Sequence, residues 1–375
     1  MAGSAAALLT AAMVSSPAQA DGKEHGGDGD PSGVTVVASG LNGPRQISDK
    51  GNGPTLLVAE SDAGRVSSVS LRNGTVTPVV SDLGQNLVQG VDWAQGRILV
   101  AIGEPGPDGP PAPPSAEPYG QSVLLGARGH QTPIVLADLA QFELDNNPDG
   151  QPQFGADGAP LDALSNPYFV LAQRNGNALI ADAGGNDIIQ RTRKGTLRLW
   201  KVLPLITDGA CADVPNNDPK VLGCDPVPTG LAYGGHDELY VSALASLVPG
   251  AGKVFVFDQK HDGPIRVIDG LTSPTGVEVD AAGNVYVSEL LEGAPAGEGP
   301  PPAGFDPSTI GQIVKIAPDG TRTYAQVTMP AGLLIHKGIL YASAWSVAGL
   351  FLGIPDRGEI VRVDDSAFAA APESS

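Results

Sequence analysis

The chain has 375 residues, of which 41 are acidic and 22 are basic, so its formal net charge is -19 at pH 7. A charge of this sign repels nucleic acids and anionic membrane surfaces, which excludes functions that depend on binding either of them. The chain also has 50 glycines and 34 prolines and no segment with the periodicity of an amphipathic helix. This composition predicts an all-β protein built from many short strands and turns.

Residues 1–20, "MAGSAAALLTAAMVSSPAQA", are small and apolar and end in Ala18-Gln19-Ala20, the small-x-small pattern of a signal peptidase site. We therefore predict a signal peptide at 1–20, a disordered leader at 21–33 and secretion; the alternative is a disordered alanine-rich end. No later stretch reaches the roughly 18 uninterrupted apolar residues that a transmembrane helix needs. We expect no membrane insertion.

The two cysteines, Cys211 and Cys224, lie in one loop rich in Pro, Asn and Asp. In an oxidising compartment this short separation predicts a local disulfide that fixes the shape of the loop. A metal site is the weaker alternative, because no other cysteine and no nearby histidine completes it.

The first predicted strand, "VTVVASGL", covers residues 34–41, and a unit of four strands follows at 43–47, 55–61, 64–69 and from residue 76 onward. The same unit recurs five more times along the chain. Its second strands are "TLLVAES" (55–61), "RILVAIG" (97–103), "ALIADAG" (178–184), "ELYVSAL" (238–244), "NVYVSEL" (284–290) and "ILYASAW" (339–345).

A small residue holds the same place in every second strand, at Ala59, Ala101, Ala181, Ser242, Ser288 and Ser343. These residues are spaced by 42, 80, 61, 46 and 55 positions, and the larger values contain long insertions. Without the insertions the spacing approaches the roughly 40–50 residues of a propeller blade. A repeated four-strand unit argues against the main alternative, a pair of β-sandwiches.

The sixth unit lacks a fourth strand, and residues 34–41 supply one from the other end of the chain. An N-terminal strand that completes the last blade closes a ring without leaving an open edge. The sequence therefore predicts one six-bladed β-propeller over residues 34–365, followed by a disordered tail at 366–375.

The long insertions all join a second strand to a third, or a fourth strand to the next blade. They cover 103–120, 141–160, 207–226, 291–309 and 345–358. Because strands alternate in direction, these connections share one face, which we call the loop-rich face. The short hairpins occupy the other, which we call the short-turn face. Recognition usually uses variable loops on a rigid scaffold, although neutral insertion at exposed turns is the alternative.

Three acids, Glu60, Asp182 and Glu289, end the second strands of alternate blades, and Asn166 begins a first strand at the same level. Carboxylate and amide oxygens are the ligands that Ca²⁺ prefers, so these residues predict a calcium site at the channel mouth. The alternative is that each acid caps its own turn by accepting backbone N–H bonds. Trp345 borders the same face, where it would stack a flat ligand or simply pack.

The segment "DNNPDG" (145–150) matches the first half of a calcium-binding loop through Asp145, Asn147 and Asp149. Ala156 stands where the bidentate Glu belongs, and no flanking helices are evident, so an Asx-rich turn is the alternative. None of the five histidines is well placed for a hydrolase triad, and the sequence has no G-x-S-x-G elbow.

With these motifs in place, the chain resembles the ScyD/ScyE family of secreted propellers. The resemblance covers most of the mature chain, although residues 240–252 depart from the family pattern. It rests on "NPDG" (147–150), "SNPY" (165–168), "ADAGGNDII" (181–189), "VPTGLAYG" (227–234) and "YVSEL" (286–290). Some of these motifs are shared with NHL-type and SMP-30-type propellers. Membership implies a secreted six-bladed propeller and supplies no securely assigned catalytic residues.

Two functions are compatible with this pattern. The first is a secreted, monomeric binding or scaffold module that recognises a small molecule, polymer or extracellular protein through the loop-rich face. The second is a hydrolase or lactonase similar to SMP-30, in which Ca²⁺ at the channel mouth polarises a carbonyl. Glu60, Asn166 and Asp182 are compatible with the second.

Overall fold

The computed structural model describes residues 32–370, except 52, 85, 106–117, 130, 160, 162–163, 296–301 and 303. The predicted signal peptide and nearly all of the predicted leader lie outside the described residues. Within residues 366–370, which the sequence placed in a disordered tail, Phe368 and Ala369 contact the fifth blade. There Ala369 pairs with Tyr324, and the Phe368 ring lies edge-on to Tyr286.

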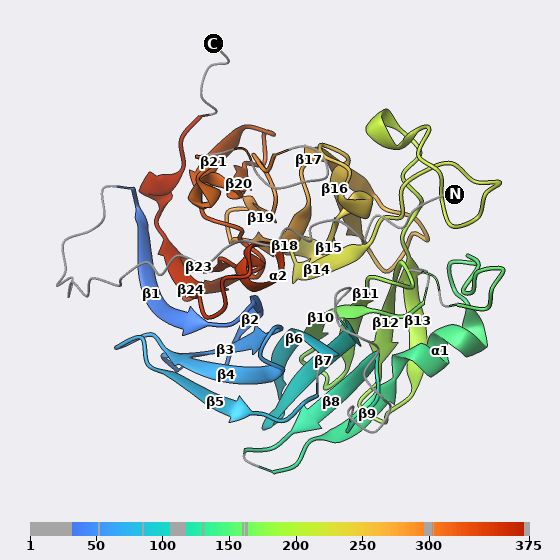
Figure 1. The fold of residues 1–375 in the computed structure, drawn as a ribbon, viewed down its shortest axis with the longest axis horizontal. Coiled ribbons are helices and arrows are strands. Elements are labelled where there is room, and N and C mark those ends of the chain that lie inside the picture. The colour runs from blue at the N-terminus through green and yellow to red at the C-terminus, as the bar shows by residue number, and fades with distance from the viewer. Residues whose placement is uncertain are drawn as a thin grey trace.

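The described strands form six four-stranded antiparallel sheets arranged as a ring, which confirms the predicted six-bladed β-propeller (Figure 1). The first blade contains β2 (Pro44–Asp49), β3 (Thr55–Glu60), β4 (Arg65–Ser70) and β5 (Val76–Val80). The second contains β6 (Asn86–Ala94), β7 (Arg97–Pro105), β8 (Val123–Ala127) and β9 (Ile134–Asp138). The third contains β10 (Pro167–Ala172), β11 (Ala178–Asp182), β12 (Asp187–Arg191) and β13 (Leu197–Val202).

The fourth blade contains β14 (Pro228–Tyr233), β15 (Leu239–Ala243), β16 (Gly252–Phe257) and β17 (Arg266–Leu271). The fifth contains β18 (Pro274–Val279), β19 (Val285–Glu289), β20 (Gln312–Ile316) and β21 (Arg322–Gln326). The sixth contains β22 (Leu333–His336), β23 (Ile339–Ala344), β24 (Gly358–Val363) and, from the other end of the chain, β1 (Val34–Leu41).

The ring closes through β1, as the sequence predicts. This strand runs antiparallel to β24, from the pair Val34–Val363 to the pair Leu41–Gly358. Leu41 is fully buried in a cluster that joins the last blade to the first. The ring is therefore closed because the N-terminal strand β1 completes the sheet formed by the C-terminal strands.

The small residues of the second strands pack where neighbouring blades meet. Ser242 Oγ donates to the carbonyl of Thr275 at 3.0 Å, and Ser288 Oγ donates to that of Ala331 at 2.6 Å, so each serine links one blade to the next. A Cβ at Gly276 would lie 2.4 Å from Ala331 O, so only glycine permits this approach of the inner strands. The repeating register in the sequence thus reflects blade contacts.

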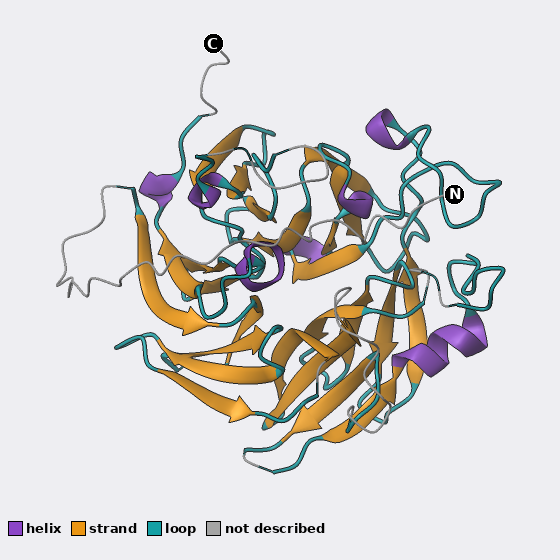
Figure 2. Cartoon of the chain, in the orientation of Figure 1, coloured by secondary structure: helices purple, strands orange, loops and turns teal. Residues whose placement is uncertain are grey.

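Two helices interrupt the β architecture, whereas the sequence predicts none with amphipathic periodicity. They are α1 (Leu139–Asn146) at the outer edge of the ring and α2 (Ala348–Leu352) (Figure 2). Asp138 caps α1 by accepting from Gln141 N at 2.9 Å. Of the α1 residues only Leu139 and Glu143 are buried, so the helix has no apolar stripe that a pattern search would find.

Short 3₁₀ turns complete the described structure: η2 (Gly209–Cys211), η3 (Gly235–Asp237), η4 (Ala245–Leu247), η5 (Pro307–Thr309) and η6 (Asp365–Ala367). Across the described part of the chain, no helix has the length and apolar character that crossing a membrane requires. The predicted disulfide is present between Cys211 and Cys224, with a Cα–Cα distance of 5.3 Å.

Candidate functional site

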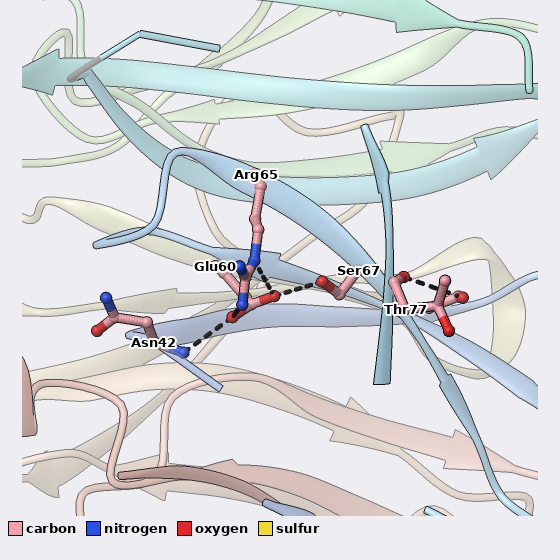
Figure 3. Close-up of polar contacts among 6 residues, drawn as sticks. Asn42, Glu60, Arg65, Ser67 and Thr77 are labelled. Atoms are coloured by element: carbon pink, nitrogen blue, oxygen red, sulfur yellow. Dashed lines mark hydrogen bonds and ion pairs between the residues drawn. The ribbon is translucent and has the colours of Figure 1, made fainter. Parts of the chain in front are cut away.

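Glu60 is fully buried at the end of β3. Both of its carboxylate oxygens accept hydrogen bonds from the first blade and from the segment that enters it (Figure 3). Arg65 holds it with two parallel bonds, Nε to Oε1 and NH2 to Oε2, each 2.8 Å long. Ser67 Oγ also donates to Oε1, and the Asn42 N–H donates to Oε2 at 2.9 Å. The hydrogen bond with Glu60 in turn raises the pKa of Arg65.

Asp182 and Glu289 have the same role in the third and fifth blades. Asp182 accepts from the backbone N–H of Asn166, and Glu289 accepts from that of Thr272 at 2.7 Å. Gln312 Nε2 donates to the other oxygen of Glu289 at 2.6 Å. In all three blades the acid therefore fastens the segment that enters the first strand, which favours the capping alternative over the metal alternative.

The other predicted channel-mouth residues are also engaged. Asn166 Oδ1 accepts from Gln89 Nε2 at 3.0 Å and from the Glu104 N–H at 3.3 Å. Trp345 is 9% exposed, and the Arg357 guanidinium lies 4.6 Å from its ring centroid. Its ring thus stacks with the protein's own cation. In the described residues no three or more His, Cys, Asp or Glu side chains are grouped to hold a metal ion. Calcium at this mouth stays a prediction.

The "DNNPDG" segment differs from the predicted loop, because its first residue belongs to a helix. Asp145 is exposed on α1 and accepts from Gln141 Nε2 at 2.8 Å. Asn147 ends the helix in the left-handed conformation, with φ 41°. Asp149 forms an Asx turn with the Gln151 N–H at 3.0 Å and accepts from Asn186 Nδ2 at 3.0 Å. The segment links α1 to the third blade.

Sequence analysis missed a group of titratable residues where the inner strands reach the short-turn face. Burial raises the pKa of Asp92 to about 7 and that of Glu278 to about 8, and the nearby Asp49 charge adds to both shifts. His336 Nδ1 lies 3.4 Å from Asp49 Oδ2. The raised pKa values of Asp92 and Glu278 therefore lie near neutral pH. Their only signal in the sequence is an acid or histidine at or near the end of a first strand.

Sequence analysis also missed a pocket of about 230 Å³ between the second and third blades, on the short-turn face. Four arginines line it: Arg97, Arg128, Arg191 and Arg193. Arg97 begins β7, Arg128 follows β8, and Arg191 and Arg193 lie together at the β12–β13 hairpin, so no single local motif contains all four. Among the described residues none of the four forms an ion pair with a carboxylate.

Two contacts shape this pocket. Arg191 Nε donates to the carbonyl of Leu136 at 3.0 Å, which ties the third blade to the second. Burial and the neighbouring charge of Arg97 lower the pKa of Arg191. A Cβ at Gly126 would lie 2.6 Å from Arg97 Cδ, so the glycine makes room for this side chain. The pocket concentrates positive charge that has no carboxylate partner among the described residues, in a strongly acidic protein.

Comparisons with known proteins support the fold. No protein-family model and no curated protein matches the chain. A PQQ-bound aldose sugar dehydrogenase from Streptomyces coelicolor aligns with TM-score 0.55 and 13% identity, over 88% of this chain and 97% of that one. A gluconolactonase from Xanthomonas campestris aligns with TM-score 0.53 and 13% identity, over 88% and 89%.

A luciferin-regenerating enzyme aligns with TM-score 0.53 and 11% identity, over 90% of this chain and 96% of that one. The aligned neighbours thus include a gluconolactonase and a sugar dehydrogenase. At these identities the similarity establishes the fold.

Proposed function

We propose that this protein is an extracellular binding propeller that holds a small anionic ligand in the four-arginine pocket, which lies on the short-turn face and not on the loop-rich face where the sequence predicts recognition. The single observation that carries the proposal is the convergence of Arg97, Arg128, Arg191 and Arg193 on one pocket without carboxylate partners among the described residues. The ligand class follows from guanidinium geometry, because its planar donors match carboxylate, phosphate and sulfate oxygens. The Cys211–Cys224 disulfide fits an oxidising, extracellular location.

Electrostatics support a specific role for this pocket. The net charge of -19 repels anions from most of the surface, so an anion is retained only where positive charge is concentrated. Four like charges around one pocket also repel each other, and a bound anion relieves this repulsion. A volume of about 230 Å³ suits a molecule about the size of a phosphorylated, sulfated or carboxylated monosaccharide or a tricarboxylate.

Isothermal titration calorimetry with inorganic phosphate, sulfate and citrate tests the proposal. The test variants are Arg97→Gln and Arg191→Gln, and the control is Arg72→Gln, an exposed arginine in a turn of the first blade. We expect citrate to bind most tightly, each pocket variant to lose about tenfold or more in affinity, and the control to bind like wild type. Equal binding by all four proteins, or no binding by wild type, would refute the pocket as the site.

A second candidate is a metal-dependent lactonase, because the gluconolactonase from Xanthomonas campestris shares the fold. Its weakness is that the three acids predicted at the channel mouth, Glu60, Asp182 and Glu289, already accept hydrogen bonds within their own blades. A panel of lactones and aryl esters, assayed with Ca²⁺, Mn²⁺, Zn²⁺ and EDTA, separates the two. Metal-dependent turnover that Asp182→Ala abolishes would favour the enzyme.

A further inference from the structure

A second buried cluster lies where α1 meets the turn between β11 and β12. Asp187 is the first residue of β12 and stands directly opposite Asp182, the last residue of β11. Both are fully buried. Like charges directly opposite each other destabilise a β-sheet, so this pair requires compensation. Asp182 has it, because its carboxylate accepts from the Ser165 hydroxyl and from the backbone N–H groups of Asn166, Gly184 and Gly185.

Asp187 has no such compensation. Among the described residues, neither of its carboxylate oxygens has a hydrogen-bond partner. The neighbouring charges that act on it are all negative, and together with burial they raise its pKa well above the usual value. A buried, unpartnered carboxylate is unfavourable unless a proton or a cation neutralises it.

Glu143 brings a second free oxygen to the same place from α1. Its side chain is fully buried, and Oε2 has no partner, while Oε1 accepts from Gln153 Nε2 at 3.2 Å. A Cβ at Gly185 would lie 2.9 Å from Glu143 Oε2, so this oxygen reaches the β11–β12 turn. Burial and the charges of Asp182 and Asp149 raise the pKa of Glu143 to about 7.

The loop after α1 meets the same turn, because Asn186 Nδ2 donates to Asp149 Oδ2 at 3.0 Å. Asn147 Oδ1 and Gln151 Oε1 in this loop are buried and have no partner in the described part of the chain. The amide nitrogens of both residues are committed elsewhere, since Asn147 Nδ2 donates to Gln151 O at 3.0 Å and Gln151 Nε2 donates to Asp225 Oδ1 at 2.6 Å. The amide oxygens are therefore the free ends of these side chains. Every unpartnered atom in this part of the fold is an acceptor.

We infer that Asp187 and Glu143 ligate one Ca²⁺ ion that ties α1 to the β11–β12 turn, with amide oxygens of the 147–151 loop as further donors. Two carboxylates balance the charge of a divalent cation. A donor set made only of carboxylate and amide oxygens, without imidazole or thiolate, selects a hard cation. Calcium tolerates the irregular geometry of helix, turn and loop donors, whereas Mg²⁺ demands a near-ideal octahedron and retains water. This site is separate from the arginine pocket and does not depend on the proposed function.

Titration of EDTA-stripped full-length protein with Ca²⁺ and with Mg²⁺ tests the inference, by calorimetry and by Tm. The test variants are Asp187→Asn and Glu143→Gln, which keep side-chain shape and remove charge. Asp145→Asn is the matched control, because Asp145 lies on the same helix and is exposed. Two test variants on different elements keep the experiment decisive if one fails to fold.

We expect wild type and the control to bind one Ca²⁺ per chain, with a rise in Tm. Each test variant should lose about tenfold or more in Ca²⁺ affinity. In EDTA each should be at least as stable as wild type, because each replaces a buried acid that must hold a proton when no cation is bound. If Ca²⁺ neither binds wild type nor raises its Tm, protons rather than a cation neutralise Asp187 and Glu143, and the inference is overturned. Undiminished binding by Asp187→Asn, or equal affinity for Mg²⁺, would also overturn it.

Discussion

The substitution Glu60→Gln tests whether the acids that end the second strands are structural caps. Glutamine keeps the volume of Glu60 but removes the charge that holds Arg65, Ser67 and the Asn42 N–H (Figure 3). Breaking a buried ion pair by removing one partner costs about 3–5 kcal/mol. The Arg65 side chain retains 30% of its exposure, and water therefore recovers part of its solvation.

The expected loss therefore lies at the low end of that range, at about 3 kcal/mol. A cooperative unit of about 330 residues unfolds with an entropy near 0.7 kcal/mol per degree, so Tm should fall by about 4 °C. We expect the same fall in EDTA and in calcium, measured by scanning calorimetry. A double-mutant cycle with Arg65→Met should give a coupling of about 1–3 kcal/mol. An unchanged Tm in EDTA, combined with loss of a calcium-dependent rise in Tm, would refute capping and make Glu60 a metal ligand.

Three further predictions concern the stability of the propeller. In EDTA, Tm should fall as pH rises from about 5 to about 8. In the folded protein the pKa is about 7 for Glu143, about 7 for Asp92 and about 8 for Glu278. The folded protein therefore keeps protons on these acids in a pH range where the unfolded chain has released them. A flat or rising profile in a fluorescence-monitored melting series would contradict these shifts. Replacing both Cys211 and Cys224 by Ser should lower the free energy of unfolding by about 3 kcal/mol. It should also make the 207–226 loop the first site of limited proteolysis. Resistance of that loop to the protease would mean that the disulfide does not shape it. Leu41→Ala should cost about 2–5 kcal/mol in denaturant unfolding, whereas Val36→Ala, on the same strand but 54% exposed, should be nearly neutral; equal effects would argue against closure of the ring by buried contacts of β1.

The sequence predicted the architecture well, because the features that specify it are local and repeated. Each second strand carries a small residue at the register where blades meet, and Ser242 and Ser288 occupy that position in the fold. Glycine-containing turns mark the short hairpins. The missing fourth strand of the last unit, together with the spare strand at residues 34–41, predicted how the ring closes. The helix α1 escaped prediction, because it presents only two buried residues to the protein.

The candidate sites depended on tertiary structure. Sequence analysis identified Glu60, Asp182 and Glu289 as equivalent positions but left open whether they bind a metal or cap a turn. The answer depends on which N–H groups the fold brings to each carboxylate. The arginine pocket and the Asp187–Glu143 cluster were not predicted from the sequence at all.

Arg97 and Arg191 come from different blades, and Glu143 and Asp187 come from α1 and β12, which a long loop and two strands separate along the chain. The sequence by itself determined the repeat, its closure and the disulfide, since strand periodicity and turn chemistry act between near neighbours along the chain. Only the tertiary structure decided which buried oxygens and guanidinium groups lack partners, because satisfaction of a polar group depends on atoms that packing brings from distant segments.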